Sequence, residues 1–538
     1  MDSLMNNVSK YTIIAIAGAL ALSACNKFLD TMPDNRTELD TEEKIASILV
    51  SAYSDRDYST TAVFMSDDFD NNAAVVTATP DRFFTQLWEW QDVTETNNAS
   101  PQNLWSANWG AIACANQALA GIESMGGPSK SQALAYAYGE ALLCRAFAHF
   151  ILVNMFCMNY NKQTSDTDLG IPYMEAPEEG LNPAYERGNV ADVYEKIDRD
   201  IQEGLKYVPD TYEVAPKYHF TRQAANAFAA KFYLFYEKPE LSLKYANDCL
   251  GTIPTLRDYA DLQANYNTIA TARRAYANSD NKCNLLIETG YTALARYWLA
   301  AYGGQYKYYG YTQNIATTEG YLSPKPWHTG AFSLADLVWR PHNYTSSNLR
   351  FSILWKADYE FEYTDPVAGR GYTRFVYVPL TTDETLLVRA EAYTLLKQYE
   401  KACDDLNLWA NNYYVADVSM TPETITNYYS GLNYYTWDSP TQKKHLHPSF
   451  DIDAEGSVQE SMLQLILNFR RTEKWGDGDR WFDIKRYGIE IYRRVVDESG
   501  KVIDYTDVLK VDDLRRAVQV PQRCIDAGLE PNPRTTND

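Results

Sequence analysis

The sequence is poor in the residues and motifs that most enzymes use for catalysis. Only six histidines occur in 538 residues. There is no His-Glu-x-x-His, no Gly-x-Ser-x-Gly, no P-loop and no Gly-x-Gly-x-x-Gly, so the common metalloprotease, serine hydrolase and nucleotide-binding classes are excluded. Glycoside hydrolysis needs two carboxylates at a defined distance in space, which a sequence does not show. The glycoside hydrolase class is therefore not excluded. We predict no catalytic residue and no cofactor.

Positive charge is scarce as well. The chain has 49 lysines and arginines against 71 acidic residues, which gives a net charge of −22. Nucleic acids and anionic lipid surfaces both attract basic proteins, so neither is an expected partner. After the N-terminal apolar segment, no run of 18 or more apolar residues is present, and we expect the mature chain to be soluble except for a lipid anchor.

The cysteines do not form the pattern of a disulfide framework. There are eight, without any Cys-x-x-Cys pair. Seven cysteines remain besides Cys25, an odd number. Most of them lie among alanines and leucines in helical patterns. They are therefore expected to be small buried hydrophobic residues.

Residues 1–24 have the pattern of a bacterial lipoprotein signal peptide. The apolar run Tyr11–Leu22 has the length of a signal-peptide core but is short of the roughly 20 residues that span a bilayer. The sequence Leu22–Ala24 before Cys25 resembles a lipobox. We predict that Cys25 becomes an acylated N-terminus and that residues 25–40 form a lipidated tether. An ordinary secretory cleavage site is the alternative.

Helical periodicity dominates most of the remaining chain. Two pairs of consecutive helices are predicted, Thr221–Tyr236 with Glu240–Leu250 and Asp383–Lys397 with Tyr399–Asn411. Each pair has an alanine-rich first helix and a short turn, which favours hairpins of the tetratricopeptide type. The predicted fold class is mainly α, a tetratricopeptide-like superhelix with an irregular, loop-rich ligand-binding region. In a domain at 41–538, the helical scaffold is assigned to about 41–55, 105–280, 383–411 and 459–490, and the loop-rich region to about 56–104, 285–382 and 412–458.

Three polar segments were weighed as metal or catalytic sites. His445 and His447 lack a third ligand nearby, so exposed polar residues are the favoured interpretation. The segment Asp451–Gly456 begins like a calcium loop, but Met462 stands where a bidentate glutamate is required, so only a looser structural calcium site remains open. The carboxylates of Asp477–Asp483 lie among arginines and lysines, which favours a structural ion-pair network over acid–base chemistry.

Aromatic residues are abundant, with 42 tyrosines and 12 tryptophans. Flat aromatic rings match the apolar face of a saccharide, and neighbouring polar groups match its hydroxyls. The alternative is that these rings anchor loops against the scaffold. The rings that we predict to bind ligand are Trp88, Trp90, Tyr302, Tyr306, Tyr308 and Tyr309.

Several motifs, taken in order, resemble those of the SusD/RagB outer-membrane lipoproteins. They cover nearly the whole mature chain, and each is weak alone. They are Cys25–Asp30 with Pro33, Trp105–Asn116, Ala141–Asn159, Leu169–Pro172, Glu384–Tyr393, Phe469–Trp475 with Asp479–Arg486, and the tail from Val520-Pro521 to Asn532-Pro533.

The resemblance implies a helical fold whose divergent loops bind ligand, and no enzymatic activity. It implies that the protein is anchored through Cys25 to the outer membrane, faces the exterior and captures oligosaccharide. Its implied partner is a SusC-like TonB-dependent transporter, over which it opens and closes as a lid. Peptide binding, as in the RagB branch, and an unrecognised surface hydrolase are the alternatives.

Overall fold

The structure is a computed structural model that describes residues 39–178, 184–266, 268–294, 297, 308–328, 330, 332–346, 349–353, 356 and 360–534. The predicted signal peptide, Cys25, most of the tether, Tyr302 and Tyr306 lie outside these residues. Most elements are helices, as predicted. They are α3 (Glu42–Leu49), α4 (Ser59–Met65), α5 (Arg82–Trp88), α6 (Pro101–Ser124), α7 (Gln132–Phe156), α8 (Val190–Gly204), α9 (Arg222–Phe235), α10 (Pro239–Leu250), α11 (Tyr259–Asn265), α12 (Ile269–Tyr276), α14 (Gln313–Thr318), α15 (Thr382–Leu395), α16 (Tyr399–Tyr413), α17 (Pro422–Ser430), α18 (Val458–Glu473), α19 (Asp479–Arg486) and α20 (Gln522–Asp526).

The long helices begin at residues whose side chains cap a helix. Ser100, Ser131, Thr221 and Thr381 each accept a hydrogen bond from the backbone N–H three residues further on. Such a bond satisfies one of the donors that the first turn leaves without a partner. Pro101 follows Ser100 at the first position of α6, where its missing N–H costs nothing. Local sequence therefore defines where these helices start.

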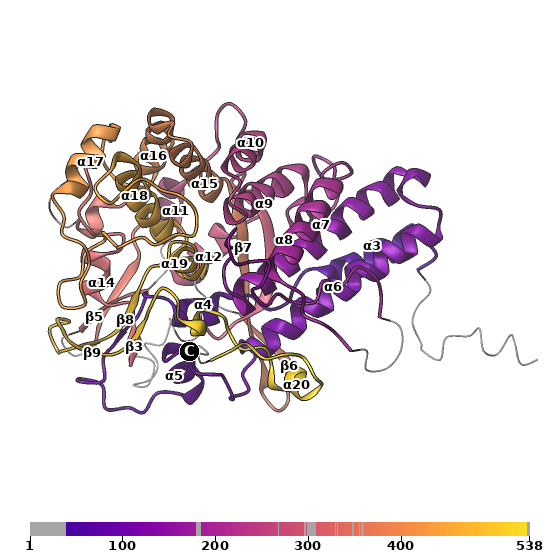
Figure 1. Cartoon of the computed structure of the whole chain (residues 1–538), viewed down its shortest axis with the longest axis horizontal. Coiled ribbons are helices and arrows are strands. Elements are labelled where there is room, and N and C mark those ends of the chain that lie inside the picture. Colours follow the sequence, from indigo (N-terminus) through magenta and orange to yellow (C-terminus); the bar gives the residue numbers. More distant parts are fainter. Residues whose placement is uncertain are drawn as a thin grey trace, which may run out of the picture.

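Both predicted hairpins are present. Helix α9 packs against α10, and α15 packs against α16. Ala246 and Ala402, the small residues on the second helices, are fully buried, which allows the paired helices to approach closely. Because α10 also contacts α15, and α7 contacts α6 and α8, the pairs form a continuous array, which runs across the top of Figure 1. The prediction of a tetratricopeptide-like helical scaffold is confirmed.

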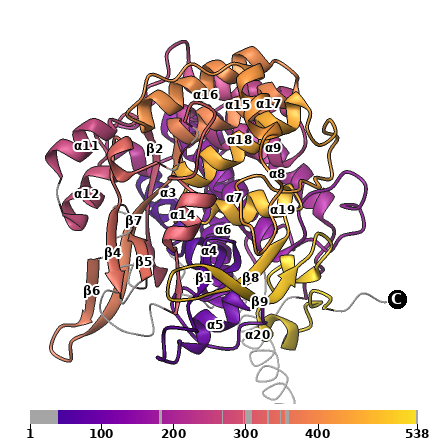
Figure 2. The ribbon, with the colours of Figure 1, turned by 90° about the vertical axis from the view of Figure 1, so that its left-hand side faces the viewer.

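Strands lie mainly within the regions predicted to be loops. Among the described residues, three small sheets have the orders β3-β1-β8-β9, β2-β7-β6 and β4-β5. In Figure 2 the strands β4 to β7 project at the lower left, below α11 and α12. The strands are β1 (Asp70–Asn71), β2 (Asn284–Tyr291), β3 (Tyr309–Gly310), β4 (His342–Ser346), β5 (Leu349–Ile353), β6 (Glu360–Asp365), β7 (Arg370–Thr381), β8 (Ile491–Val496) and β9 (Val502–Leu509).

The predicted loop-rich region therefore contains more regular structure than expected. Helices α4, α5, α14 and α17 also lie within it. These elements are short, and the strands pair with partners distant in sequence, so a local pattern in the sequence indicates them only weakly.

In the part of the chain that the structure describes, the core consists of two hydrophobic clusters. One lies among α3 and the helices α6 to α9, and the other among α4, α5 and the helices α14 to α18. Helix α7 is long and apolar enough to cross a membrane by composition, but its apolar window is entirely buried inside the fold. That burial is the property of a core helix.

Candidate functional site

Trp88 and Trp90, predicted to bind ligand, lie inside the fold. Their side chains are 1% and 3% exposed. The guanidinium carbon of Arg493 lies 3.7 Å from the ring centroid of Trp90 and 4.9 Å from that of Trp88. The structure therefore does not support contact between these indoles and a ligand. The polar residues around them in the sequence gave no indication of an arginine about 400 residues further on.

The remaining predicted rings that the structure describes are Tyr308 and Tyr309. Tyr309 is 2% exposed and stacks on Trp88, with ring centroids 4.8 Å apart. Its hydroxyl donates a hydrogen bond to Thr85, so it is also a structural residue. Tyr308 is half-buried and packs edge-on against Tyr309, with ring centroids 5.0 Å apart.

Tyr308 is thus the outermost ring of a rigid stack, which we call the Tyr308 platform (Tyr308, Tyr309 and Trp88). The backbone carbonyl of Tyr308 accepts a hydrogen bond of 2.8 Å from the Asn72 N–H. A ring supported from below and held by its backbone loses little conformational entropy when a ligand stacks on it. Of the predicted binding residues that the structure describes, Tyr308 alone keeps a partly accessible ring.

A second aromatic site, missed in the sequence, is the recess around half-buried Trp339. Trp339 stacks on Tyr259 and Tyr276, with centroid distances of 5.7 and 5.6 Å. The recess also contains Glu473, which accepts hydrogen bonds from the Tyr259 hydroxyl and the Trp409 N–H, and Lys356, which donates to the Glu473 carbonyl oxygen. Its volume is about 20 Å³, room for roughly one water molecule. Because the enclosed space is this small and its rings stack on one another, we interpret the recess as part of the core.

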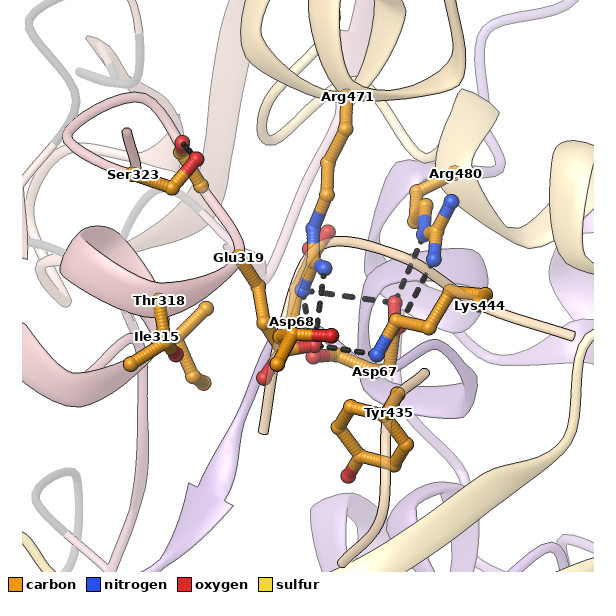
Figure 3. Close-up of polar contacts among 12 residues, drawn as sticks. Asp67, Asp68, Ile315, Thr318, Glu319, Ser323, Tyr435, Lys444, Arg471 and Arg480 are labelled. Atoms are coloured by element: carbon orange, nitrogen blue, oxygen red, sulfur yellow. Dashed lines mark hydrogen bonds and ion pairs between the residues drawn. The ribbon is translucent and has the colours of Figure 1, made fainter. Parts of the chain in front are cut away.

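Buried charged side chains form a group that we call the charge cluster, part of which is shown in Figure 3. Its members are all buried or nearly so and come from segments far apart in the sequence. The acidic members are Asp67, Asp68, Asp70 and Glu319, and the basic members are Lys444, Arg471, Arg480 and Arg494.

Glu319 is the central acid of the charge cluster. Its carboxylate lies 2.5 Å from Lys444 Nζ, 2.6 Å from an Arg494 nitrogen and 3.3 Å from an Arg471 nitrogen. Burial alone would raise the pKa of Glu319, but these three cations outweigh it and lower the pKa to about 2. The carboxylate therefore stays ionised at neutral pH and is held by cations on several sides.

The other acids of the cluster are paired in the same way. Arg480 Nε donates to Asp67 at 2.8 Å, and Arg471 Nε donates to Asp68 at 3.0 Å. A general acid or base must exchange a proton with a substrate that can reach it, and these carboxylates are engaged by buried cations. The cluster joins α14, α18, α19 and β8 to the segment after α4, which is a structural role.

The segment Asp477–Asp483 is part of a similar network. Asp479 accepts a hydrogen bond from Lys231 and lies 3.5 Å from Lys474 Nζ. Asp483 pairs with Arg470 at 2.8 Å. This geometry agrees with the structural interpretation that the sequence favoured, although Lys231 as a partner was not foreseen.

The two loops considered for metal binding pair with other side chains. His445 Nδ1 lies 2.6 Å from the Glu455 carboxylate, and Lys397 Nζ lies 2.7 Å from Asp453. Among the residues that the structure describes, no group of three or more His, Cys, Asp and Glu side chains is arranged to hold a metal ion.

Comparison with family models gives matches at both ends of the chain. Residues 27–234 match a model described as "Starch-binding associating with outer membrane". Residues 382–512 match the model of the SusD family. No curated protein matches the chain.

Solved structures share the fold over nearly the whole chain at low sequence identity. A SusD superfamily protein from Bacteroides thetaiotaomicron has 17% identity and a TM-score of 0.61, covering 93% of this chain and all of its own. A SusD superfamily protein from Bacteroides vulgatus has 18% identity and a TM-score of 0.59, covering 93% and 99%. A SusD-like carbohydrate binding protein from B. vulgatus has 15% identity and a TM-score of 0.52, covering 84% of each chain.

Proposed function

The chain belongs to the SusD/RagB family, and from this premise we propose that it captures oligosaccharide at the cell surface without cleaving it. Proteins of this family are associated with the outer membrane and bind carbohydrate. The finer proposal is that the Tyr308 platform, with Tyr302 and Tyr306 in the adjoining segment, forms the ligand surface. From there the glycan passes to a SusC-like TonB-dependent transporter.

The observation that carries this proposal is the support beneath Tyr308. Its ring packs on Tyr309, which stacks on Trp88, which in turn lies near the buried guanidinium of Arg493. Such a stack keeps one ring in place at the surface, and stacking on aromatic rings is how proteins hold the apolar face of a flat ligand. A non-catalytic role is supported by the ion pairs that engage the clustered buried carboxylates.

We further propose that Cys25 is acylated and holds the protein on the outer face of the outer membrane. Replacing its thiol with a hydroxyl, Cys25→Ser, removes the acylation site. We expect the variant to leave the membrane fraction, as measured by fractionation and by labelling intact cells with antibody. Retention of Cys25→Ser in the outer membrane would contradict lipid anchoring.

The binding proposal is tested by isothermal titration of residues 26–538, which include every described residue, against plant, host and microbial polysaccharides. Tyr308→Ala is expected to weaken binding about fivefold or more, because a stacked ring contributes about 1 kcal/mol or more. Tyr218→Ala is the matched control, because Tyr218 is an exposed tyrosine on the helical array, far from the platform in sequence.

Each outcome has a defined meaning. Binding without shortened products, weakened in Tyr308→Ala but not in Tyr218→Ala, supports the proposal. Release of shortened products by the purified protein would favour the hydrolase alternative. If Tyr308→Ala and Tyr218→Ala bind the glycan equally well, the Tyr308 platform is not part of the ligand surface.

Peptide binding is a second candidate, favoured by one observation. Strand β6 is the outer strand of the sheet β2-β7-β6, and all six of its residues are exposed. An open sheet edge can pair with an extended peptide through backbone hydrogen bonds. Binding of a peptide mixture, abolished by Thr364→Pro on this strand, would support this function in place of glycan capture.

A further inference from the structure

A cluster of partly exposed rings forms where the turn around Trp437 packs against the hairpin of β8 and β9. Trp437 packs against Tyr505 with ring centroids 5.2 Å apart, and Tyr505 packs against Tyr492 at 5.4 Å. Tyr505 is 38% exposed, and the other two rings are half-buried. We call Trp437, Tyr492 and Tyr505 the hairpin patch. The hairpin lies below α17 and α18 at the left of Figure 1.

Trp437 is held at the tip of a tight turn. The backbone groups of Thr436 and Ser439 exchange two hydrogen bonds, with N–O distances of 3.3 and 3.2 Å. The Thr436 hydroxyl also donates to Asp438 at 2.8 Å. These bonds fix the turn before any ligand arrives, so little entropy is lost when a ligand contacts the indole.

Exposed hydroxyl and carboxylate groups flank Trp437 in its turn. Thr436, Asp438 and Ser439 lie next to Trp437 in sequence, and all three are exposed. A saccharide has an apolar C–H face that stacks on a ring and hydroxyls that donate to carboxylates. The turn of Trp437 offers both kinds of contact in neighbouring residues.

We propose that the hairpin patch is a second carbohydrate contact, which binds a distant part of the same polysaccharide that the Tyr308 platform holds. This inference rests on the proposed function. An apolar protein surface fits less well, because covering the exposed Asp438 carboxylate without a further hydrogen-bond donor would carry a desolvation penalty. A sugar supplies those donors from its own hydroxyls.

The sheet connects the two contacts. In the order β3-β1-β8-β9, Tyr308 precedes one edge strand and Tyr505 lies on the other. Adjacent strands are about 4.8 Å apart, so the two edge strands are separated by roughly 14 Å. A polysaccharide can reach across that distance, whereas a disaccharide cannot. The second contact therefore adds avidity for long chains only.

The test compares polymer with short sugar on the full-length protein purified in detergent. Native gels contain amylopectin, arabinoxylan, mixed-linkage β-glucan or yeast mannan, and disaccharides from each polymer are titrated by calorimetry. The variant is Trp437→Ala/Tyr505→Ala. The matched control is Tyr138→Ala/Tyr207→Ala, a half-buried ring pair 5.2 Å apart on α7 and the segment after α8.

We expect the Trp437→Ala/Tyr505→Ala variant (the hairpin variant) to bind the polymer that retards the wild type at least tenfold more weakly. Its binding of the disaccharides should be unchanged. The control pair should change neither. Equal polymer binding by the hairpin variant and the wild type would overturn the second contact while leaving glycan capture intact. If none of the polymers retards the wild-type protein in the gel, the proposal of glycan capture itself is overturned. If the double variant does not fold, Trp437→Ala alone, at an exposed turn, replaces it.

Discussion

The indole N–H of Trp90 donates a hydrogen bond of 2.9 Å to the carbonyl oxygen of Met65, the last residue of α4. Arg493 donates to the carbonyl oxygens of Phe64, Met65 and Ser66. The last carbonyls of a helix have no partner within it, so the indole and the guanidinium together cap α4. Trp90 adopts a φ of 53°, an unfavourable conformation for a residue with a side chain, and this packing maintains it.

Replacing Trp90 is therefore expected to affect stability rather than ligand binding. Trp90→Ala should lower the free energy of unfolding by about 3–5 kcal/mol, because it leaves a cavity beneath Arg493 and removes one of the two hydrogen bonds to the Met65 carbonyl oxygen. Trp90→Phe keeps a ring there and should cost less. Urea unfolding measures both. If Trp90→Ala lost glycan binding while its stability was unchanged, Trp90 would be a ligand-binding residue and not a structural one.

The comparison of Trp90 with Ala246 shows which features a sequence can reveal. Ala246 lies in a helix whose periodicity and short preceding turn are local, and the predicted hairpin is present. The burial of Trp90 depends on Arg493, whose position in space follows from the folded topology alone. The pairing of Arg480 with Asp67, 413 residues apart, is hidden for the same reason. Local signals predicted the scaffold, while long-range partners decided which aromatic rings stay exposed.

Removing the central acid of the charge cluster should be strongly destabilising. Glu319→Ala leaves Lys444, Arg471 and Arg494 with less negative charge inside the fold. Removing one partner of a buried ion pair costs about 3–5 kcal/mol. Denaturant unfolding measures the loss. Glu498→Ala, at an exposed position, should change stability by less than about 0.5 kcal/mol, and an equal effect of the two variants would contradict the structural role.

The same carboxylate should contribute to acid denaturation. The pKa of Glu319 is about 2 in the folded state and ordinarily 4.5, so between these values the unfolded chain binds more protons. Its stabilising contribution is present above pH 4.5 and is lost as the pH falls towards 2, by about 3 kcal/mol. Glu319→Gln should unfold with a shallower pH dependence in this window. An unchanged slope would contradict the assignment.

Gly478 is expected to tolerate no side chain. Its φ is +92°, and a Cβ atom there would lie 2.9 Å from the Cβ of Ala62 and 3.0 Å from the Cα of Ser59. Gly478→Ala should therefore push α19 away from α4 and lower the midpoint of thermal unfolding. Gly456 has a similar φ of +83° but open space around it. Gly456→Ala therefore measures the loss of stability caused by the left-handed backbone conformation without a close contact. Equal losses in the two variants would show that the close contact has no effect.

Glu288 should produce the opposite pH dependence to Glu319. Burial, together with the nearby charge of Asp57, raises the pKa of Glu288 from 4.5 to about 7, although its hydrogen bond from the Tyr377 hydroxyl opposes the shift. Between pH 4.5 and 7 the folded state binds more protons than the unfolded chain. The stability that Glu288 contributes is therefore complete below pH 4.5 and is lost as the pH rises through 7.

The variant Glu288→Gln keeps an acceptor for Tyr377 but cannot ionise. Relative to the wild type, it should gain about 3 kcal/mol of stability between pH 4.5 and 8, measured by denaturant unfolding at half-unit intervals. Glu362→Gln, on the exposed strand β6, is the control and should follow the wild type. If Glu288→Gln also runs parallel to the wild type, the carboxyl is ionised in the folded state at neutral pH, and the interior around Asp57 must then contain a compensating charge.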